Sequence, residues 1–187
     1  MAVEHPTVIR RRFYALLAIG AILGCGLIAA SARRRVVPLT PGEPFPALDL
    51  VDWRGGSPVV LATTRSPTVV ILVHSGCHFC AEQLDELSEH FSALPNASII
   101  ILTGETAPPA DHPARWPRLA SDSAVRWVRG NPTQVLAAYR TLETPSLFIY
   151  DRQGRLRRSF RGLTQMGTLA RALSPVASAN ALAPSPH

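Results

Sequence analysis

The sequence contains no lysine, so all 19 of its basic residues are arginines. Against 13 acidic residues they give a formal net charge of +6. Six of the arginines flank a single hydrophobic run, as residues 10–12 and 33–35, and the rest of the chain is close to neutral. Because the net charge away from that run is close to zero, the high isoelectric point gives no support for nucleic-acid binding. We expect these arginines to meet lipid headgroups instead.

Cysteine is also scarce, with only Cys25, Cys77 and Cys80 present. A structural zinc site needs four ligands, and the chain has no second cysteine pair to complete one. A purely structural disulfide between Cys77 and Cys80 would close a ring too small to constrain much of the unfolded chain. Two cysteines at this spacing on a first helical turn can instead alternate between a disulfide and a dithiol. The pattern favours a redox site, and we expect no metal.

Long hydrophobic runs are absent except for one. Residues 13–30 form a stretch of 18 residues without a charge, about the minimum that spans a bilayer. This segment can be an uncleaved anchor, a lipoprotein signal that leaves Cys25 at the N-terminus, or an export signal cleaved after Ala32. Three arginines stand on each side, so the charge pattern does not orient it. We interpret it as a transmembrane anchor.

The composition divides the chain into three parts. Residues 1–35 are the basic segment with its membrane anchor or signal. Residues 36–173 have the patterning of a single folded domain. Residues 174–187 are rich in alanine, proline and serine, and are predicted to be disordered.

Within the middle part, apolar strands alternate with helical patterns. Residues 68–73 and 97–102 are continuously apolar, as expected for strands buried on both faces. The helix between them carries an apolar stripe, formed by Cys80, Leu84, Leu87, Phe91 and Leu94. Strand, helix and strand in this order predict a βαβ unit with parallel strands. The other expected elements are a hairpin of residues 48–51 and 58–62, a loop at 103–117, a short strand at 118–121, a helix from 132 to about 140 capped by Asn131, a hairpin of residues 146–150 and 156–161, and a last helix at 164–173.

The stretch Cys77-His78-Phe79-Cys80 lies where the first apolar strand gives way to this helix. Cys77 would stand at the helix N-terminus, where free N–H groups and the helix dipole favour a thiolate. The thiolate is the form that attacks disulfides, and Cys80, one turn further, would be shielded and act as the resolving thiol. A cationic His78 would stabilise the Cys77 thiolate, and His74 is the other titratable group nearby. We predict Cys77, Cys80 and His78 as catalytic residues.

The order of these parts resembles the thioredoxin fold over about residues 41–173. The more specific resemblance is to membrane-anchored bacterial thiol–disulfide oxidoreductases of the TlpA/ResA (redoxin) type. It is carried by residues 41–50 (PGEPFPALDL), residues 69–87 around the cysteine pair, and residues 144–156 (TPSLFIYDRQGRL). It implies an α/β fold with a central mixed sheet flanked by helices, an N-terminal β-hairpin extension and one N-terminal transmembrane helix.

The resemblance also implies a substrate-binding role for Thr144 and Pro145. In the family this proline is cis and packs beside the disulfide, and the residue before it offers backbone groups to the partner peptide. The chain departs from the family at other positions. Gly76 and Phe79 stand where the W-C-x-P-C pattern has Trp and Pro, and Gln83 stands where a Glu is frequent. The strand before the motif also lacks the buried acid of many thioredoxins.

We therefore expect an enzyme that reduces disulfides of client proteins, without a cofactor. By resemblance, it would sit in the bacterial inner membrane through residues 13–30, with its soluble domain in the periplasm. A membrane thiol relay would be the electron donor, and cytochrome c maturation is one possible client pathway. One alternative is a peroxiredoxin-like peroxidase, although His74 stands where its Thr-x-x-Cys pattern needs threonine. Another is a copper-binding assembly protein that uses Cys77, Cys80 and a histidine such as His74.

Overall fold

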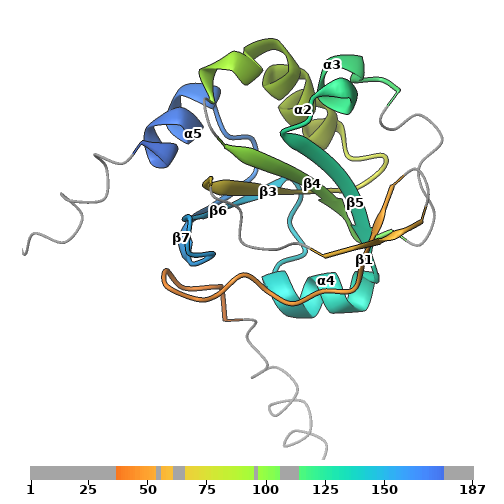
Figure 1. The fold of residues 1–187 in the computed structure, drawn as a ribbon, viewed down its shortest axis with the longest axis vertical. Coiled ribbons are helices and arrows are strands. Elements are labelled where there is room, and N and C mark those ends of the chain that lie inside the picture. Colours follow the sequence, from red (N-terminus) through yellow and green to blue (C-terminus); the bar gives the residue numbers. More distant parts are fainter. Residues whose placement is uncertain (1–36, 54–55, 61–65, 95–96, 106–113, 175–187) are drawn as a thin grey trace, which may run out of the picture. The chain divides into compact units, whose positions relative to one another are not determined.

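The computed structural model describes residues 37–53, 56–60, 66–94, 97–105 and 114–174 (Figure 1). The predicted membrane segment 13–30, Cys25 and residues 175–187 of the predicted tail lie outside the described residues. Within the described ranges, no helix is long and apolar enough to cross a membrane. The domain boundaries and the anchor therefore stay predictions.

A seven-stranded mixed sheet forms the centre of the domain, in the order β2-β1-β5-β4-β3-β6-β7. The three central neighbours β5, β4 and β3 are parallel, and the other pairs are antiparallel. The strands are β1 (Leu50–Asp52), β2 (Pro58–Val59), β3 (Thr68–Val73), β4 (Ser98–Thr103), β5 (Val125–Gly130), β6 (Ser146–Tyr150) and β7 (Leu156–Arg161). The predicted mixed sheet is confirmed, as are its two hairpins, β1–β2 and β6–β7.

Helices cover both faces of the sheet. They are α2 (His78–His90), followed by the short 3-10 helix η1 (Phe91–Ala93), then α3 (Pro117–Ser121), α4 (Pro132–Tyr139) and α5 (Met166–Leu173). In Figure 1, α2, α3 and α5 lie on one side and α4 on the other, next to the extended segment before β1. Each side encloses its own apolar core, one containing Leu84, Leu87 and Leu169 and the other Val135 and Tyr139.

Strand β3 is the central element that leads into the cysteine pair. All six of its residues are buried, which explains its unbroken apolar sequence and confirms the prediction of a strand covered on both faces. It pairs in parallel with β4, from Thr68 opposite Ser98 to Val73 opposite Thr103. Because the two strands are parallel and in register, the chain leaves both at the same edge of the sheet.

One prediction before the third parallel strand was wrong, and that strand itself was missed. Residues 118–121 belong to helix α3 instead of a strand, and Pro117 occupies its first turn, where proline suits a helix. The strand that follows, β5, was not predicted at all. Arg126 and Arg129 interrupt its apolar residues, but Val125 and Trp127 are buried while Arg126 is exposed. The alternation covers only these three residues, because Val128 is buried directly after Trp127, so it is too short to identify a strand from the sequence.

The helix predictions need smaller corrections. Helix α2 ends at His90, so Phe91 and Leu94 of the predicted stripe follow it, and Phe91 is only half-buried. Helix α4 begins as predicted, because the side-chain oxygen of Asn131 accepts hydrogen bonds from the N–H groups of residues 133 and 134. The last helix begins at Met166 instead of Thr164, and the N–H of Thr164 donates a hydrogen bond to Gln83 of α2.

Candidate active site

A tight turn delivers the chain from β3 to the first cysteine. The N–H of Cys77 donates to the carbonyl of His74 at 3.2 Å, which closes a four-residue turn. Its third residue, Gly76, has φ of +76°. A side chain at such a φ is strained, so glycine suits this position. The turn places Cys77 directly at the start of α2.

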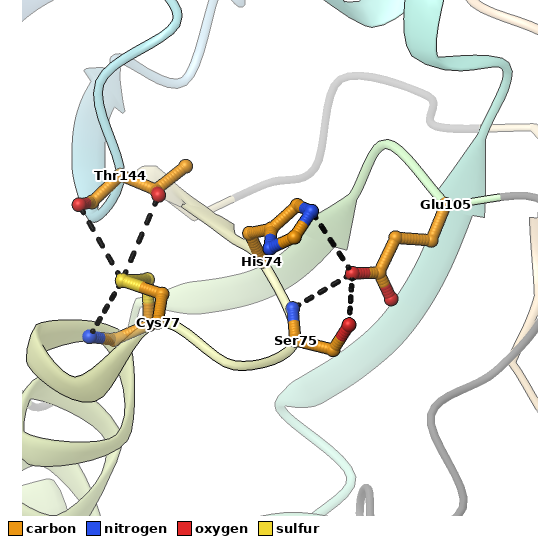
Figure 2. A network of polar contacts seen from close by, with 6 residues as sticks. His74, Ser75, Cys77, Glu105 and Thr144 are labelled. Atoms are coloured by element: carbon orange, nitrogen blue, oxygen red, sulfur yellow. Dashed lines mark hydrogen bonds and ion pairs between the residues drawn. A yellow bond between two sulfur atoms is a disulfide. The ribbon is translucent and has the colours of Figure 1, made fainter.

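Cys77 is the N-cap of α2, and a disulfide joins it to Cys80 with 5.2 Å between the Cα atoms. The Cys77 sulfur accepts a hydrogen bond from the N–H of Cys80 at 3.2 Å. The hydroxyl of Thr144 donates to the same sulfur at 3.7 Å, and the Thr144 carbonyl oxygen lies 3.5 Å away (Figure 2). The two donors favour a thiolate at this position in the reduced protein, whereas the carbonyl oxygen opposes one.

The two cysteines differ in accessibility. Cys77 is half-buried, whereas Cys80 is 1% exposed and belongs to the core beneath α2. An attacking thiol must meet its substrate and a resolving thiol need not, so this difference matches the roles predicted for the two residues. The roles themselves stay predictions.

Of the two predicted substrate-binding residues, Thr144 contacts the Cys77 sulfur although it is 67 residues away in sequence, and Pro145 follows it directly. The Thr144–Pro145 bond is cis, as the resemblance implied. Thr144 is half-buried and Pro145 is buried. The Pro145 carbonyl accepts from the N–H of Gly162 at 2.8 Å, which ties this loop to the one before α5.

Gln83 connects α2, the helix that begins at Cys77, to Thr164 in the loop before α5. Its side chain is completely buried, its Oε1 accepts from the N–H of Thr164 at 2.7 Å, and its Nε2 donates to the Thr164 carbonyl at 3.1 Å. The sequence marked Gln83 only as a departure from the family pattern. Its burial one turn after Cys80 places it on the inner side of α2, between Cys80 and Leu87.

The histidines near the motif lie at the surface. His78 is exposed, and its ring lies 5.8 Å from that of Phe79, which is itself 57% exposed. His74 is also exposed, and its Nε2 lies 3.5 Å from a carboxylate oxygen of Glu105. The proposed assistance of Cys77 by His78 stays a prediction.

Glu105 is a site residue that the sequence reasoning missed, because it falls in the stretch interpreted as a loop. Figure 2 shows its carboxylate directed at the turn before Cys77, where it contacts both His74 and Ser75. The parallel pairing of β3 and β4 was predicted, and it was the signal that could have found this residue. Glu105 follows the end of β4 by as many residues as Ser75 follows the end of β3.

In the part of the chain that the structure describes, no group of three or more histidine, cysteine and acidic side chains is arranged to hold a metal ion. The site residues brought together are instead two cysteines and the threonine-proline pair. This arrangement can carry out thiol–disulfide exchange.

Solved structures with the same architecture include a thio-disulfide isomerase from Thermus thermophilus, which is 25% identical and has a TM-score of 0.54, with 72% of this chain and 95% of that chain covered. The thioredoxin domain of a thiol-disulfide oxidoreductase from Bacteroides vulgatus is 19% identical with a TM-score of 0.54, covering 73% and 99%. The chain has a thioredoxin fold. A peroxiredoxin-like protein from Aquifex aeolicus shares this thioredoxin fold too, at 14% identity and a TM-score of 0.56, with coverage of 73% and 87%.

No protein-family model matches the sequence, and no curated protein sequence matches it. The thioredoxin fold alone therefore leaves the chemistry to be decided by the site. A cysteine pair at disulfide distance, with its first sulfur at a helix N-terminus, is the arrangement of a thiol–disulfide oxidoreductase.

Proposed function

We propose that this protein is an extracytoplasmic thiol–disulfide oxidoreductase that reduces disulfides in specific client proteins. The observation that carries the proposal is the unequal environment of the two bonded sulfurs. Cys77 is half-buried beside Thr144 at a helix N-terminus, and Cys80 is inside the core. The neighbours named for thiol–disulfide chemistry support the same class.

The reaction begins with the reduced pair. The Cys77 thiolate attacks one sulfur of a client disulfide, so a Cys77–client bond forms and the other client sulfur leaves as a thiolate, which takes a proton from water. Cys80 then gives up its proton and attacks the Cys77 sulfur. The Cys77–Cys80 disulfide forms, and the second client thiolate leaves and takes up that proton. Two electrons pass from the protein to the client, and a thiol donor must supply them again.

The residues around the pair suit these steps. The N–H of Cys80 and the Thr144 hydroxyl both point at the Cys77 sulfur and stabilise its thiolate before attack. Thr144 lies beside that sulfur, and the segment that it begins with Pro145 is suited to pair with the backbone of an extended client segment. Cys80 stays out of solvent, so small oxidants and unrelated thiols reach it slowly.

The location and partners belong to the same proposal. The 18 uncharged residues at 13–30, flanked by arginines, support a single-pass anchor in the bacterial inner membrane. The domain would then face the periplasm and receive electrons from a membrane thiol relay, as in the TlpA/ResA type. Clients in cytochrome c maturation are consistent with that resemblance. An alkaline phosphatase fusion after Leu173 should be active, and activity only of a cytoplasmic reporter there would refute the location.

Trapping of clients tests the chemistry directly. Cys80→Ser should accumulate mixed disulfides with client proteins, because attack remains possible while resolution is lost. Cys77→Ser should trap none and should not reduce insulin disulfides. Trapping through Cys80 alone would contradict the assignment. Insulin reduction by the wild type, without peroxide turnover or copper retained through purification, would separate it from the peroxidase and copper-protein alternatives.

The direction of electron flow follows from the reduction potential of the pair. Equilibration with a glutathione series should give a value near that of thioredoxin, about −270 mV, as expected for a reductase. A value near −120 mV would show that the protein is an oxidant, and would overturn the reductase proposal.

A further inference from the structure

A single carboxylate oxygen of Glu105 contacts the turn before Cys77 three times. Oε1 accepts hydrogen bonds from the N–H of Ser75 at 2.7 Å and from the Ser75 hydroxyl, and it lies 3.5 Å from Nε2 of His74 (Figure 2). The Glu105 side chain is only 14% exposed, whereas that of His74 is 63% exposed. A carboxylate this far removed from water depends on such donors.

The strand register explains why this contact forms. Val73 is paired with Thr103 at the ends of β3 and β4. Continuing in parallel by two residues brings Ser75 opposite Glu105, outside the sheet but still adjacent. The contact therefore joins two segments that leave the same sheet edge, and it does not depend on a long side chain crossing open space.

The bonded residue, Ser75, is the second residue of the turn that leads to Cys77. The carboxylate binds both its backbone and its side chain, so it restrains the position and the orientation of the turn together. Gly76 follows with φ of +76°, and the N–H of Cys77 closes the turn on His74. Glycine has more conformational freedom than any other residue type, so an external contact on Ser75 reduces the number of conformations that this turn can adopt.

We propose that Glu105 is a positioning residue for Cys77. By holding Ser75, it fixes the turn so that the Cys77 sulfur is directed at the N–H of Cys80. The inference rests on the proposed role of Cys77 as the attacking thiol. When the turn is released, the thiolate loses part of its hydrogen bonding, so the pKa of the Cys77 thiol rises. The dithiol then becomes less stable relative to the disulfide.

The negative charge of Glu105 acts in the opposite direction, because a nearby anion disfavours a thiolate. Two substitutions separate the effects. Glu105→Ala removes both the acceptor and the charge. Glu105→Gln removes the charge, while its amide oxygen can still accept from the Ser75 N–H and hydroxyl. A positioning role predicts different results for the two, whereas a role of the charge alone predicts the same result.

The experiment uses the reduced full-length protein. The rate of Cys77 alkylation by iodoacetamide is measured against pH with mass-spectrometric detection, and the disulfide is equilibrated with glutathione. Glu105→Ala should raise the alkylation midpoint by about 0.5 to 1 pH unit, which is a three- to tenfold loss of thiolate. A tenfold shift of the glutathione equilibrium towards the disulfide corresponds to a reduction potential of the Cys77–Cys80 pair that is lower by about 30 mV.

Glu105→Gln should keep the wild-type midpoint or lower it slightly. The matched control is Glu89→Ala, which removes an exposed carboxylate from the far end of α2 and should change neither quantity. Thermal unfolding of each variant shows whether a shift comes with general destabilisation, which alone would not move the pH midpoint of a folded site.

A wild-type midpoint in Glu105→Ala would overturn the proposal, and so would equal shifts in the alanine and glutamine variants. Should Glu105→Ala fail to fold, Ser75→Ala removes only the hydroxyl donor and should shift the midpoint in the same direction by less, with no shift overturning the proposal. None of these measurements uses a client protein. Failure of the wild type to reduce insulin would therefore count against the proposed function and leave the positioning of Cys77 to be judged by the midpoints.

Discussion

The buried side chain of Gln83 leads to the most quantitative prediction. Its amide both accepts from and donates to the backbone of Thr164, and it is completely buried. In Gln83→Glu, a protonated carboxyl can make the same two bonds, because its O–H replaces the amide as donor. The ionised form cannot donate, so it leaves the Thr164 carbonyl facing a buried negative charge.

The pH dependence follows from the difference between the folded and unfolded states. Burial raises the pKa of the introduced carboxyl in the folded protein above its unfolded value of about 4.3. Its stabilising bonds are therefore fully present below the unfolded pKa and are lost as the pH rises towards the folded pKa. Between the unfolded and the folded pKa, each pH unit lowers the free energy of unfolding by about 1.4 kcal/mol. For a folded pKa above 7, the variant should lose about 2.7 kcal/mol between pH 5 and pH 7, relative to the wild type.

Urea denaturation of the oxidised full-length protein at pH 5, 6, 7 and 8 measures this difference. The control is Gln165→Glu, which makes the same chemical change at an exposed position and should give a difference independent of pH over this range. Gln83→Leu should be destabilised at every pH, because two backbone groups of Thr164 lose their partners at about 1–3 kcal/mol each. A flat difference for Gln83→Glu would refute the reasoning, since it would mean that water reaches this side chain.

Three further predictions concern the site, the core and the N-terminal segment. Thr144→Val removes a donor from the Cys77 sulfur and should raise the pKa of that thiol, measured as a higher pH midpoint of alkylation; an unchanged midpoint would mean that the hydroxyl does not reach the reduced sulfur. Leu84→Ala, at a side chain with no exposure, should lower the free energy of unfolding by about 2–5 kcal/mol, and a loss below about 1 kcal/mol would contradict its place in the core. Hydrogen bonds from the backbone and hydroxyl of Thr40 lower the pKa of Glu43 below its ordinary value, so its contribution to stability is present at neutral pH and lost as the pH falls through that lowered pKa. In Glu43→Gln, the free energy of unfolding should therefore fall less steeply with decreasing pH below about pH 4.5. The same steepness as in the wild type, measured by urea denaturation at acidic pH, would count against this contact.

The sequence by itself determined the elements whose signal is local. Strand β3 is unbroken and apolar because both of its faces are covered, and α2 carries the 3.6-residue period of a helix packed on one side. Asn131 begins α4 through hydrogen bonds to its own first turn. Such features depend only on neighbouring residues, so composition and period predict them. The same holds for the cysteine pair, since its spacing sets the small ring that can open and close.

Other features depend on how distant segments are brought together, and only the tertiary structure decided them. Strand β5 carries two arginines that obscure its period, and its identity comes from pairing with β1 and β4. Thr144 reaches the Cys77 sulfur from 67 residues away. From the sequence, Gln83 was only a departure from the family pattern, and the fold shows that its side chain binds the backbone of Thr164.

Glu105 illustrates the physical reason. Nothing in the residues around it distinguishes it from any acid in a surface loop. Its role arises because β3 and β4 run parallel in a register that brings it opposite Ser75, where burial makes its hydrogen bonds strong. Local backbone preferences and apolar periods decide which elements form. The contacts that adjust a reactive thiol are set by sheet order and register, which are properties of the whole chain.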